Sequence, residues 1–131
     1  NPVAVTEFTY NFVSLCAKLV KFLQPLPKTV GIRVEIRNAF FDNSKLYMIP
    51  YGTGTYAWLF DDRQFEAPEA SMLREIDVAT EELTSRPGVV AYSLVEKIYT
   101  WFGISTDKIP YIGTEGERKF VDPQKIINSK P

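Results

Sequence analysis

The sequence predicts an α+β fold: a two-layer sandwich in which two long helices cover one face of a four-stranded antiparallel sheet, in the order αββββα. Apolar residues recur at helical spacing over residues 5–23 and again over 88–102. Between these two segments, residues 30–37 alternate strictly between apolar and other side chains, as a strand with one buried face does. The remaining strand-like segments are joined by short turns, which favours an antiparallel meander.

The first predicted helix, residues 5–23, is amphipathic. Its apolar stripe consists of Val5, Phe8, Phe12, Leu15, Cys16, Leu19, Phe22 and Leu23, and its polar side consists of Glu7, Asn11, Ser14, Lys18 and Lys21. We expect the apolar stripe to be buried against the sheet. Pro25 and Pro27 end the helix because proline cannot donate the next backbone hydrogen bond.

Four strands are expected after this helix. In the first, Val30, Ile32, Val34 and Ile36 form the buried face, and Gly31, Arg33, Glu35 and Arg37 form the exposed one. The others are expected over residues 46–49, 56–60 and 72–78. The segment 51–55 contains two glycines and leads into an apolar strand instead of a helix, so it is interpreted as a hairpin turn and not as a phosphate-binding loop.

The second long helix, residues 88–102, has recognisable signals at both ends. Thr80 is expected to cap a short turn over 81–84, and Pro87 suits the first turn of the helix. Gly103 is placed to end the helix in a left-handed conformation.

Beyond residue 112 the chain becomes polar and rich in glycine. We therefore expect a single α+β domain over residues 1–112, followed by an irregular tail over 113–131.

Composition restricts the chemistry. The 131 residues include no histidine and a single cysteine, Cys16, and their net charge is −1. Without histidine the usual general base and metal ligand are missing, so we expect no catalytic residues, no metal, no cofactor and no enzymatic role. A single cysteine forms no intrachain disulfide, which suits the cytoplasm.

Charge and hydropathy point away from nucleic acid and membrane. Basic and acidic residues are interspersed along the chain, and the apolar stretch 12–23 contains two lysines and is too short to span a bilayer. Nucleic-acid binding without chemistry would require Lys18, Lys21, Arg33, Arg37 and Lys45 to form one positive surface.

The leading hypothesis is a non-catalytic interaction or sensing module. Aromatic residues are abundant, and they cannot all fit beneath two helices, so some are expected on a recognition surface. The expected binding residues lie on the outward strand face: Arg33, Glu35, Arg37, Tyr56 and Trp58. The partner would be another domain of the parent protein, a second copy of this chain, or a small ligand.

The alternative function is a magnesium-dependent enzyme acting on nucleic acid or nucleotide. Glu35, Asp61 and Asp62 would be the metal ligands, with Asp42 also near in sequence, and they would have to converge on one point. The simpler interpretation of the alternating Arg33, Glu35 and Arg37 is a solvated strand face with weak ion pairs.

Two segments, residues 34–38 (VEIRN) and 90–103 (VAYSLVEKIYTWFG), carry a family resemblance. With the preceding helix, they resemble the region that follows the Schlafen/AlbA-type ATP-binding domain in some bacterial proteins. The resemblance covers residues 5–103 and implies an accessory domain of a larger bacterial regulatory or defence protein; it transfers no functional residue. The chain begins Asn1-Pro2-Val3 without methionine, which agrees with the expectation of an excised domain.

Overall fold

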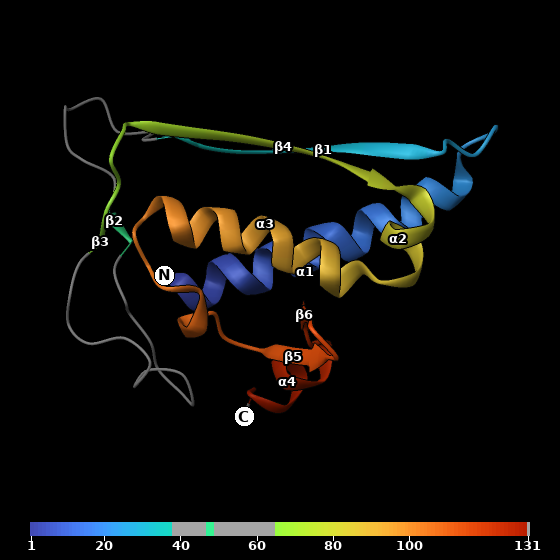
Figure 1. Cartoon of the computed structure of the whole chain (residues 1–131). Helices are drawn as coiled ribbons and strands as arrows, with labels where there is room; N and C mark the ends of the chain where they lie inside the picture. The colour runs from blue at the N-terminus through green and yellow to red at the C-terminus, as the bar shows by residue number, and fades with distance from the viewer. Residues whose placement is uncertain (38–46, 49–64, 131) are drawn as a thin grey trace.

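The structure, a computed structural model, describes residues 1–37, 47–48 and 65–130 (Figure 1). The elements that lead to the candidate site are, in chain order, α1 (Pro2–Leu19), the 3-10 helix η1 (Val20–Phe22), β1 (Thr29–Arg37), β2 (Tyr47–Met48), β3 (Phe65–Glu66) and β4 (Ser71–Ala79). They are followed by α2 (Thr80–Ser85), α3 (Pro87–Trp101), the 3-10 helix η3 (Thr106–Lys108), β5 (Ile112–Glu115), β6 (Arg118–Val121) and α4 (Pro123–Asn128).

The two long strands pair directly with each other. β1 and β4 are antiparallel over their full lengths, from Thr29 opposite Ala79 to Arg37 opposite Ser71. The strands predicted over 30–36 and 72–78 are confirmed, and β2 lies within the predicted segment 46–49. The strand predicted over 56–60 lies outside the described residues.

The predicted four-stranded sheet is wrong for the part of the chain that the structure describes. The strands there form three separate antiparallel pairs, β1–β4, β2–β3 and β5–β6. The strands of a meander would pair in chain order, but here the first long strand pairs with the last one before α2. The alternation of apolar residues shows which face of a strand is buried, but it does not show which strand lies beside it. The pattern alone therefore could not predict that β1 pairs with β4.

Helices α1 and α3 lie side by side beneath one face of the β1–β4 pair, as expected (Figure 1). Val13 of α1, Ile32 of β1 and Leu94 of α3 belong to the same buried cluster. The first turn of α1 is capped by the side chain of Asn1, which accepts hydrogen bonds from the backbone nitrogens of Val3 and Ala4. The mixed α and β character of the fold is therefore confirmed.

The segment expected to be an irregular tail has regular structure. Residues 112–128 form the β5–β6 hairpin and α4, which lie on the side of the helices away from β1 and β4 (Figure 1). Gly116 at the hairpin turn has a φ of 61°, and the Asp122 side chain caps α4 by accepting from the nitrogen of Gln124. The described residues thus form three layers, with the helices in the middle, instead of two.

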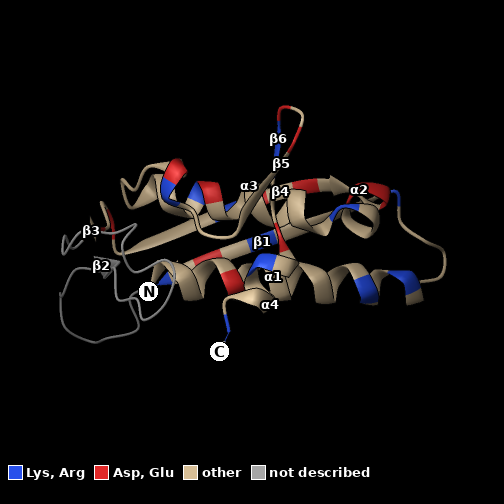
Figure 2. Ribbon diagram, turned by 90° about the horizontal axis from the view of Figure 1, so that it is seen from below, with Lys and Arg blue, Asp and Glu red and all other residues tan. Residues whose placement is uncertain are grey.

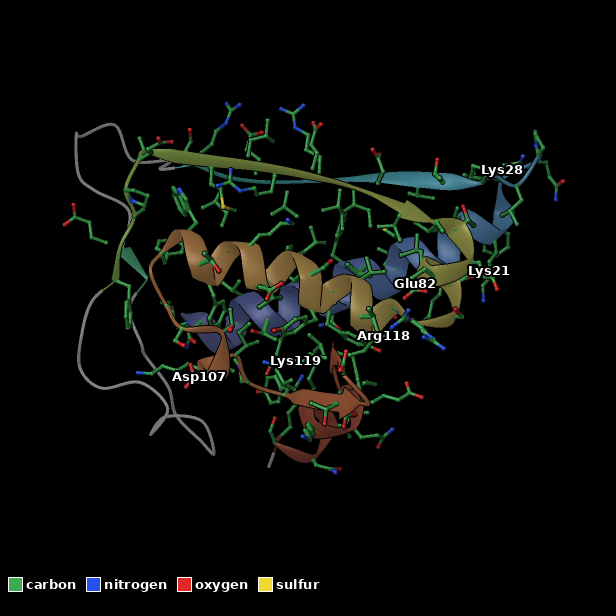
Figure 3. The ribbon with its side chains drawn as sticks, in the orientation of Figure 1. Lys21, Lys28, Glu82, Asp107, Arg118 and Lys119 are labelled. Carbon is green, nitrogen blue, oxygen red and sulfur yellow. The ribbon has the colours of Figure 1, made fainter. Side chains whose placement is uncertain are left out.

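Contacts near the start of α3 hold the C-terminal hairpin against the helices. An ion pair joins Glu82 of α2 to Arg118 of β6, with 3.5 Å between Oε1 and Nη1 (Figure 3). At Gly88 an added Cβ would lie 2.5 Å from the carbonyl oxygen of Val121, so only glycine allows β6 to approach α3 this closely. Gly103 ends the helix with a φ of 71°, as predicted.

Thr80 has a different role from the one expected. The N-cap of α2 is Ala79, and Thr80 is the first helical residue. The Thr80 hydroxyl donates to the carbonyl oxygen of Pro27, and its backbone nitrogen donates to that of Lys28. Thr80 therefore anchors the loop between η1 and β1 to the start of α2.

Candidate functional site

The phenylalanine and leucine side chains of α1 and η1 are exposed. Phe8 is 75% exposed, Leu15 52% and Phe22 81%. The exposed set is defined here as the α1 outer face and consists of Phe8, Phe12, Leu15, Leu19 and Phe22, continued by Leu23 and Leu26. The expectation that this stripe is buried against the sheet is wrong.

A different face of the helix packs into the core. It consists of Pro2, Thr6, Thr9, Val13 and Ala17, followed by Val20 of η1. Most of these side chains are small, which lets α1 pack closely on α3. The Tyr99 hydroxyl of α3 donates to the carbonyl oxygen of Pro2 at 2.9 Å and lies 3.2 Å from the Thr6 hydroxyl. These bonds fix which face of α1 is buried.

One signal in the sequence could have revealed the outer face. A surface helix buries an apolar stripe about 100° wide or somewhat more. In α1 the valine and alanine positions 13, 17 and 20 lie outside the stripe that runs from Phe8 to Phe22, so the helix has two apolar arcs. The burial of Thr6 and Thr9, by contrast, could not be predicted from the spacing of residues within α1, because it depends on Tyr99 of α3.

A cavity of about 410 Å³ lies where the outer face meets β1. Its apolar lining includes Phe8 and Phe12 of α1, Val34 and Ile36 of β1, and Ile98 of α3. Among the described strands, β1 pairs only with β4, so its other edge runs along this cavity. An apolar hollow beside a strand edge offers a partner both hydrophobic contact and backbone hydrogen bonds.

The charges beside the outer face are separated along the helix. Glu7 lies near the start of α1, whereas Lys18 and Lys21 lie near its end and in η1. Figure 2 shows the basic positions of this helix at the end away from the N-terminus. The Glu7 carboxylate accepts a 2.7 Å hydrogen bond from the Tyr111 hydroxyl, which holds it beside the helix.

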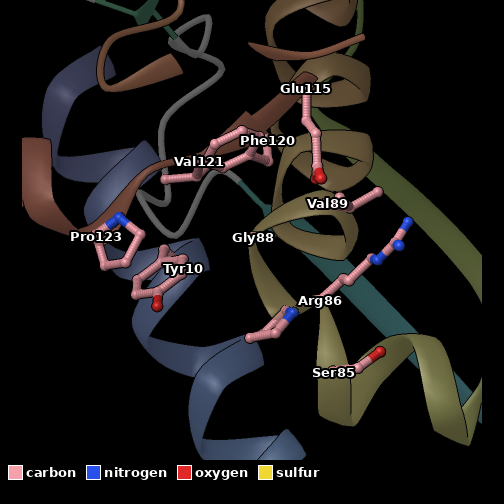
Figure 4. A pocket seen from close by; sticks show the side chains of 10 residues that line it. Tyr10, Ser85, Arg86, Gly88, Val89, Glu115, Phe120, Val121 and Pro123 are labelled. Atoms are coloured by element: carbon pink, nitrogen blue, oxygen red, sulfur yellow. The ribbon is translucent and has the colours of Figure 1, made fainter. Parts of the chain in front are cut away.

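A second pocket lies on another side of the molecule, between the start of α3 and the C-terminal hairpin (Figure 4). It has a volume of about 230 Å³ and is lined mainly by apolar groups, including Tyr10, Val89 and Phe120, with Arg86 and Glu115 at its margin. Pockets that enclose small ligands usually exceed about 300 Å³. This pocket is therefore a weaker candidate than the cavity beside β1.

The structure brings together three of the five binding residues predicted from the sequence. Arg33, Glu35 and Arg37 lie on the exposed face of β1, where Glu35 pairs with Arg37 and lies 3.9 Å from Arg33. Glu75 of β4 lies 3.9 Å from Arg33 on the same face. Tyr56 and Trp58 lie outside the described residues. The three charged residues have the geometry of a solvated strand face with weak ion pairs.

The alternative functions rest partly on residues that the structure does not describe. Asp42, Asp61 and Asp62 of the magnesium hypothesis are outside the described ranges, and within those ranges no three acidic or cysteine side chains are grouped to hold a metal ion. Lys45, one of the five basic residues that nucleic-acid binding would require, also lies outside the described residues.

Two further properties of α1 bear on function. Burial raises the pKa of the Cys16 thiol above its usual value, which lowers its reactivity at neutral pH. Pro2–Phe22 has 21 residues and includes an 18-residue window with a mean hydropathy of 1.2, so it is long and apolar enough to cross a membrane by length and composition alone. This segment is longer than residues 12–23, the apolar stretch that was judged from the sequence to be too short to span a bilayer. The core helix of a soluble protein and an N-terminal signal sequence meet the same criterion, and 28% of the apolar window is buried in this structure.

Comparison of the chain with protein-family models, with curated proteins and with solved structures found no match.

Proposed function

We propose that this domain is a non-catalytic protein–protein association module whose contact surface is the α1 outer face. The observation that carries the proposal is the exposure of Phe8, Phe12, Leu15, Leu19 and Phe22 on successive turns of one helix. Scattered exposed apolar residues are ordinary, but a contiguous set of large ones marks an interaction site.

The energy available at this surface is considerable. Complete burial of one large apolar side chain contributes roughly 1.5–3 kcal/mol. Two or three well-buried anchors among the five would supply the usual core of a protein interface, since a few residues carry most of the binding energy. The lysines at the end of the helix would form part of the polar rim.

The position of β1 favours a protein over a membrane as the partner. The edge of β1 opposite β4, which pairs with no other described strand, lies beside the outer face, along the cavity that Phe12 and Val34 both line. Lipid would leave the backbone groups of that edge without hydrogen-bond partners, which costs several kcal/mol for each group. A protein can satisfy them by adding a strand.

The expectations from the sequence enter this proposal in changed form. The interaction module is retained, but its main surface moves from the outward face of β1 to α1. The accessory role in a larger bacterial protein remains a prediction that rests on the resemblance alone. The magnesium-dependent enzyme remains the alternative, and its test is the position of Asp61 and Asp62 relative to Glu35.

Photo-cross-linking in cells that produce the protein tests the proposal. Para-benzoylphenylalanine replaces Phe8 on the outer face or, as the matched control, Lys97, an exposed residue of α3. We expect a discrete protein adduct from position 8 and none from position 97. The captured protein is then identified by mass, purified, and its affinity for the wild-type domain is measured.

If the interface is specific, Leu15→Lys should lower the affinity of the domain for the captured protein at least about tenfold. The reason is that a buried anchor residue contributes more than about 1.4 kcal/mol to binding. Equal labelling from both positions, or an adduct with lipid alone, would refute the association module.

A further inference from the structure

We infer that the α1 outer face binds the same face of a second copy of this chain, so that the two α1 helices pack as a short antiparallel coiled coil. This inference rests on the proposed association function and names its partner. Three observations carry it: the spacing of the exposed side chains along α1, the direction in which the outer face points, and the distribution of charge along the helix.

The exposed side chains of α1 have the spacing of a coiled coil. Steps of four, three, four and three residues separate Phe8, Phe12, Leu15, Leu19 and Phe22. These are the a and d positions of a heptad repeat, which lets one helix pack lengthwise against another at a crossing angle of about 20°. The stripe is narrow, as such a contact requires, because the exposed residues beside it, Asn11 and Lys18, are polar. The pattern therefore indicates a helical partner.

The outer face points away from the neighbouring helix and strand. Val13 of α1 belongs to one buried cluster with Leu94 of α3 and Ile32 of β1. Leu15 and Leu19 lie on the opposite side of α1 from Val13, because positions on a helix are about 100° apart. In Figure 2, α1 forms one margin of the helix layer. A second helix can therefore lie along α1 on the side away from α3.

This contact is made by the helices and not by the strands. Packed helices lie about 8–10 Å apart, whereas paired strands lie about 4.8 Å apart. In each copy β1 lies over the junction of α1 and α3, on the side of α1 away from the partner (Figure 2). The β1 strands of the two copies are therefore farther apart than the α1 helices, and the two sheets stay separate. The helices form one layer in the order α3–α1–α1–α3.

The apolar residues of the two helices match when the helices run in opposite directions. We place the two-fold axis midway between Phe12 and Leu15. Phe12 is then level with the partner's Leu15, and Phe8 is level with the partner's Leu19. Each of these layers contains one a position and one d position, so every layer of the contact joins two large apolar side chains.

Charge favours this antiparallel arrangement over a parallel one. Glu7, Asn11 and Lys18 lie on one flank of the outer face, with the acidic residue near the start of α1 and the basic residue near its end. The axis brings this flank against the same flank of the partner, where Glu7 lies about 3 Å along the helix from the level of the partner's Lys18. This attraction occurs twice. Parallel helices would instead bring the two Lys18 side chains to one level and align the helix dipoles.

The exposed area suits a weak dimer. With roughly 200 Å² for each large apolar side chain, the exposed fractions of the five residues amount to roughly 600 Å² in each copy. Two copies together would bury about 1,200 Å², which is the lower end of the range for specific protein interfaces. We therefore expect a dissociation constant in the micromolar range.

Sedimentation velocity of the full chain at concentrations up to about 100 μM tests the inference. We expect the wild type to dimerise. Leu19→Gln removes an apolar contact twice from the symmetric interface and should raise the dissociation constant at least about tenfold. The matched control is Leu73→Gln, which changes an exposed leucine of β4 and should leave the dissociation constant unchanged. Melting temperatures of both variants show that they fold.

Cross-linking tests the direction of the helices. In a Cys16→Ser background, Phe8→Cys and Leu19→Cys are mixed in equal amounts and treated with a short thiol cross-linker. We expect cross-linked dimers in the mixture, because position 8 of one copy is level with position 19 of the other. Phe8→Cys alone should form none, since its two thiols are then eleven residues, about 16 Å, apart along the helices.

A wild type that remains monomeric, equal weakening by Leu19→Gln and Leu73→Gln, no cross-link in the mixture, or a cross-link of Phe8→Cys with itself would each overturn the inference. If position 8 then still captures another protein specifically in the photo-cross-linking experiment, the proposed function stands with a different partner. If it captures nothing, both fail.

Discussion

At the scale of single residues, Tyr99 determines which face of α1 packs against α3. Its ring is fully buried on α3, and its hydroxyl bonds to the first turn of α1. The hydroxyl of Thr6 also donates to the carbonyl oxygen of Pro2, at 3.2 Å, so three polar groups satisfy one another inside the core. Loss of one member would leave the others partly unsatisfied, which is costly in a buried site.

Tyr99→Phe should lower the free energy of unfolding by about 1–2 kcal/mol, because it removes the hydroxyl that bonds to Pro2 and Thr6. Urea denaturation followed by circular dichroism measures the change. Tyr92→Phe is the matched control on the same helix, since the Tyr92 hydroxyl is 3.5 Å from Glu96 and only partly buried. A loss at position 92 as large as that at position 99 would disprove this role for Tyr99.

Tyr99 should also make the free energy of unfolding depend on pH in the alkaline range. Burial raises the pKa of Tyr99 above its ordinary value of 10, so the folded state keeps the phenol proton that the unfolded chain releases. This contribution to stability is complete below pH 10 and is lost as pH rises above it, by about 1.4 kcal/mol per unit.

Between pH 10 and 11, the wild type should therefore lose up to about 1.4 kcal/mol more unfolding free energy than Tyr99→Phe, as measured by denaturant titration at both pH values. Equal losses in the two proteins would show that Tyr99 titrates normally in the folded state.

At the scale of elements, α1 has two faces with separate roles. Val13 is fully buried, whereas Leu15, two residues away, is about half exposed. Val13→Ala should lower the free energy of unfolding by roughly 2 kcal/mol, because it removes buried methyl groups and leaves a cavity. Leu15→Gln should change it by less than about 0.5 kcal/mol. Thermal unfolding of the two variants in dilute solution checks this, and a reversed order would mean that the wrong face has been assigned to the core.

The close packing of α3 on β6 at Gly88 should make the stability of the fold sensitive to a substitution there. Gly88→Ala should destabilise the fold by about 1–3 kcal/mol, because the new Cβ would overlap the backbone of β6 at Val121. Gly31→Ala is the control, since its Cβ would make an ordinary 3.5 Å contact with Asp77. Chemical denaturation compares the two variants. Gly88→Ala as stable as the wild type would show that α3 and β6 are not held at this separation.

Local sequence signals predicted most of these elements. The alternation from Val30 to Ile36, the glycine at 103 and the prolines after α1 each act within a few residues, and each has its predicted effect. The pairing of β1 with β4 and the C-terminal hairpin were missed because they depend on contacts between segments far apart in the chain. The turn at Gly116 and the cap at Asp122 were visible as separate residues, but composition alone made the segment look irregular.

At the scale of the whole molecule, the three layers account for the exposed surface. Helix α3 is enclosed between β1–β4 on one side and the β5–β6 hairpin on the other, and α1 covers a third side of it (Figure 1). Because the small residues of α1 are turned toward α3, its large apolar residues face outward, beside exposed polar residues such as Asn11 and Lys18. Periodicity shows that α1 has two apolar arcs, but it does not show which of the two the rest of the fold covers.

We propose that the α1 outer face serves association and not folding. The most direct measurement is the yield of the covalent adduct from para-benzoylphenylalanine at position 8, compared between the wild-type background and Leu15→Lys. We expect Leu15→Lys to reduce the yield at least about tenfold while the melting temperature stays unchanged. An unchanged yield in a protein that remains folded would contradict it.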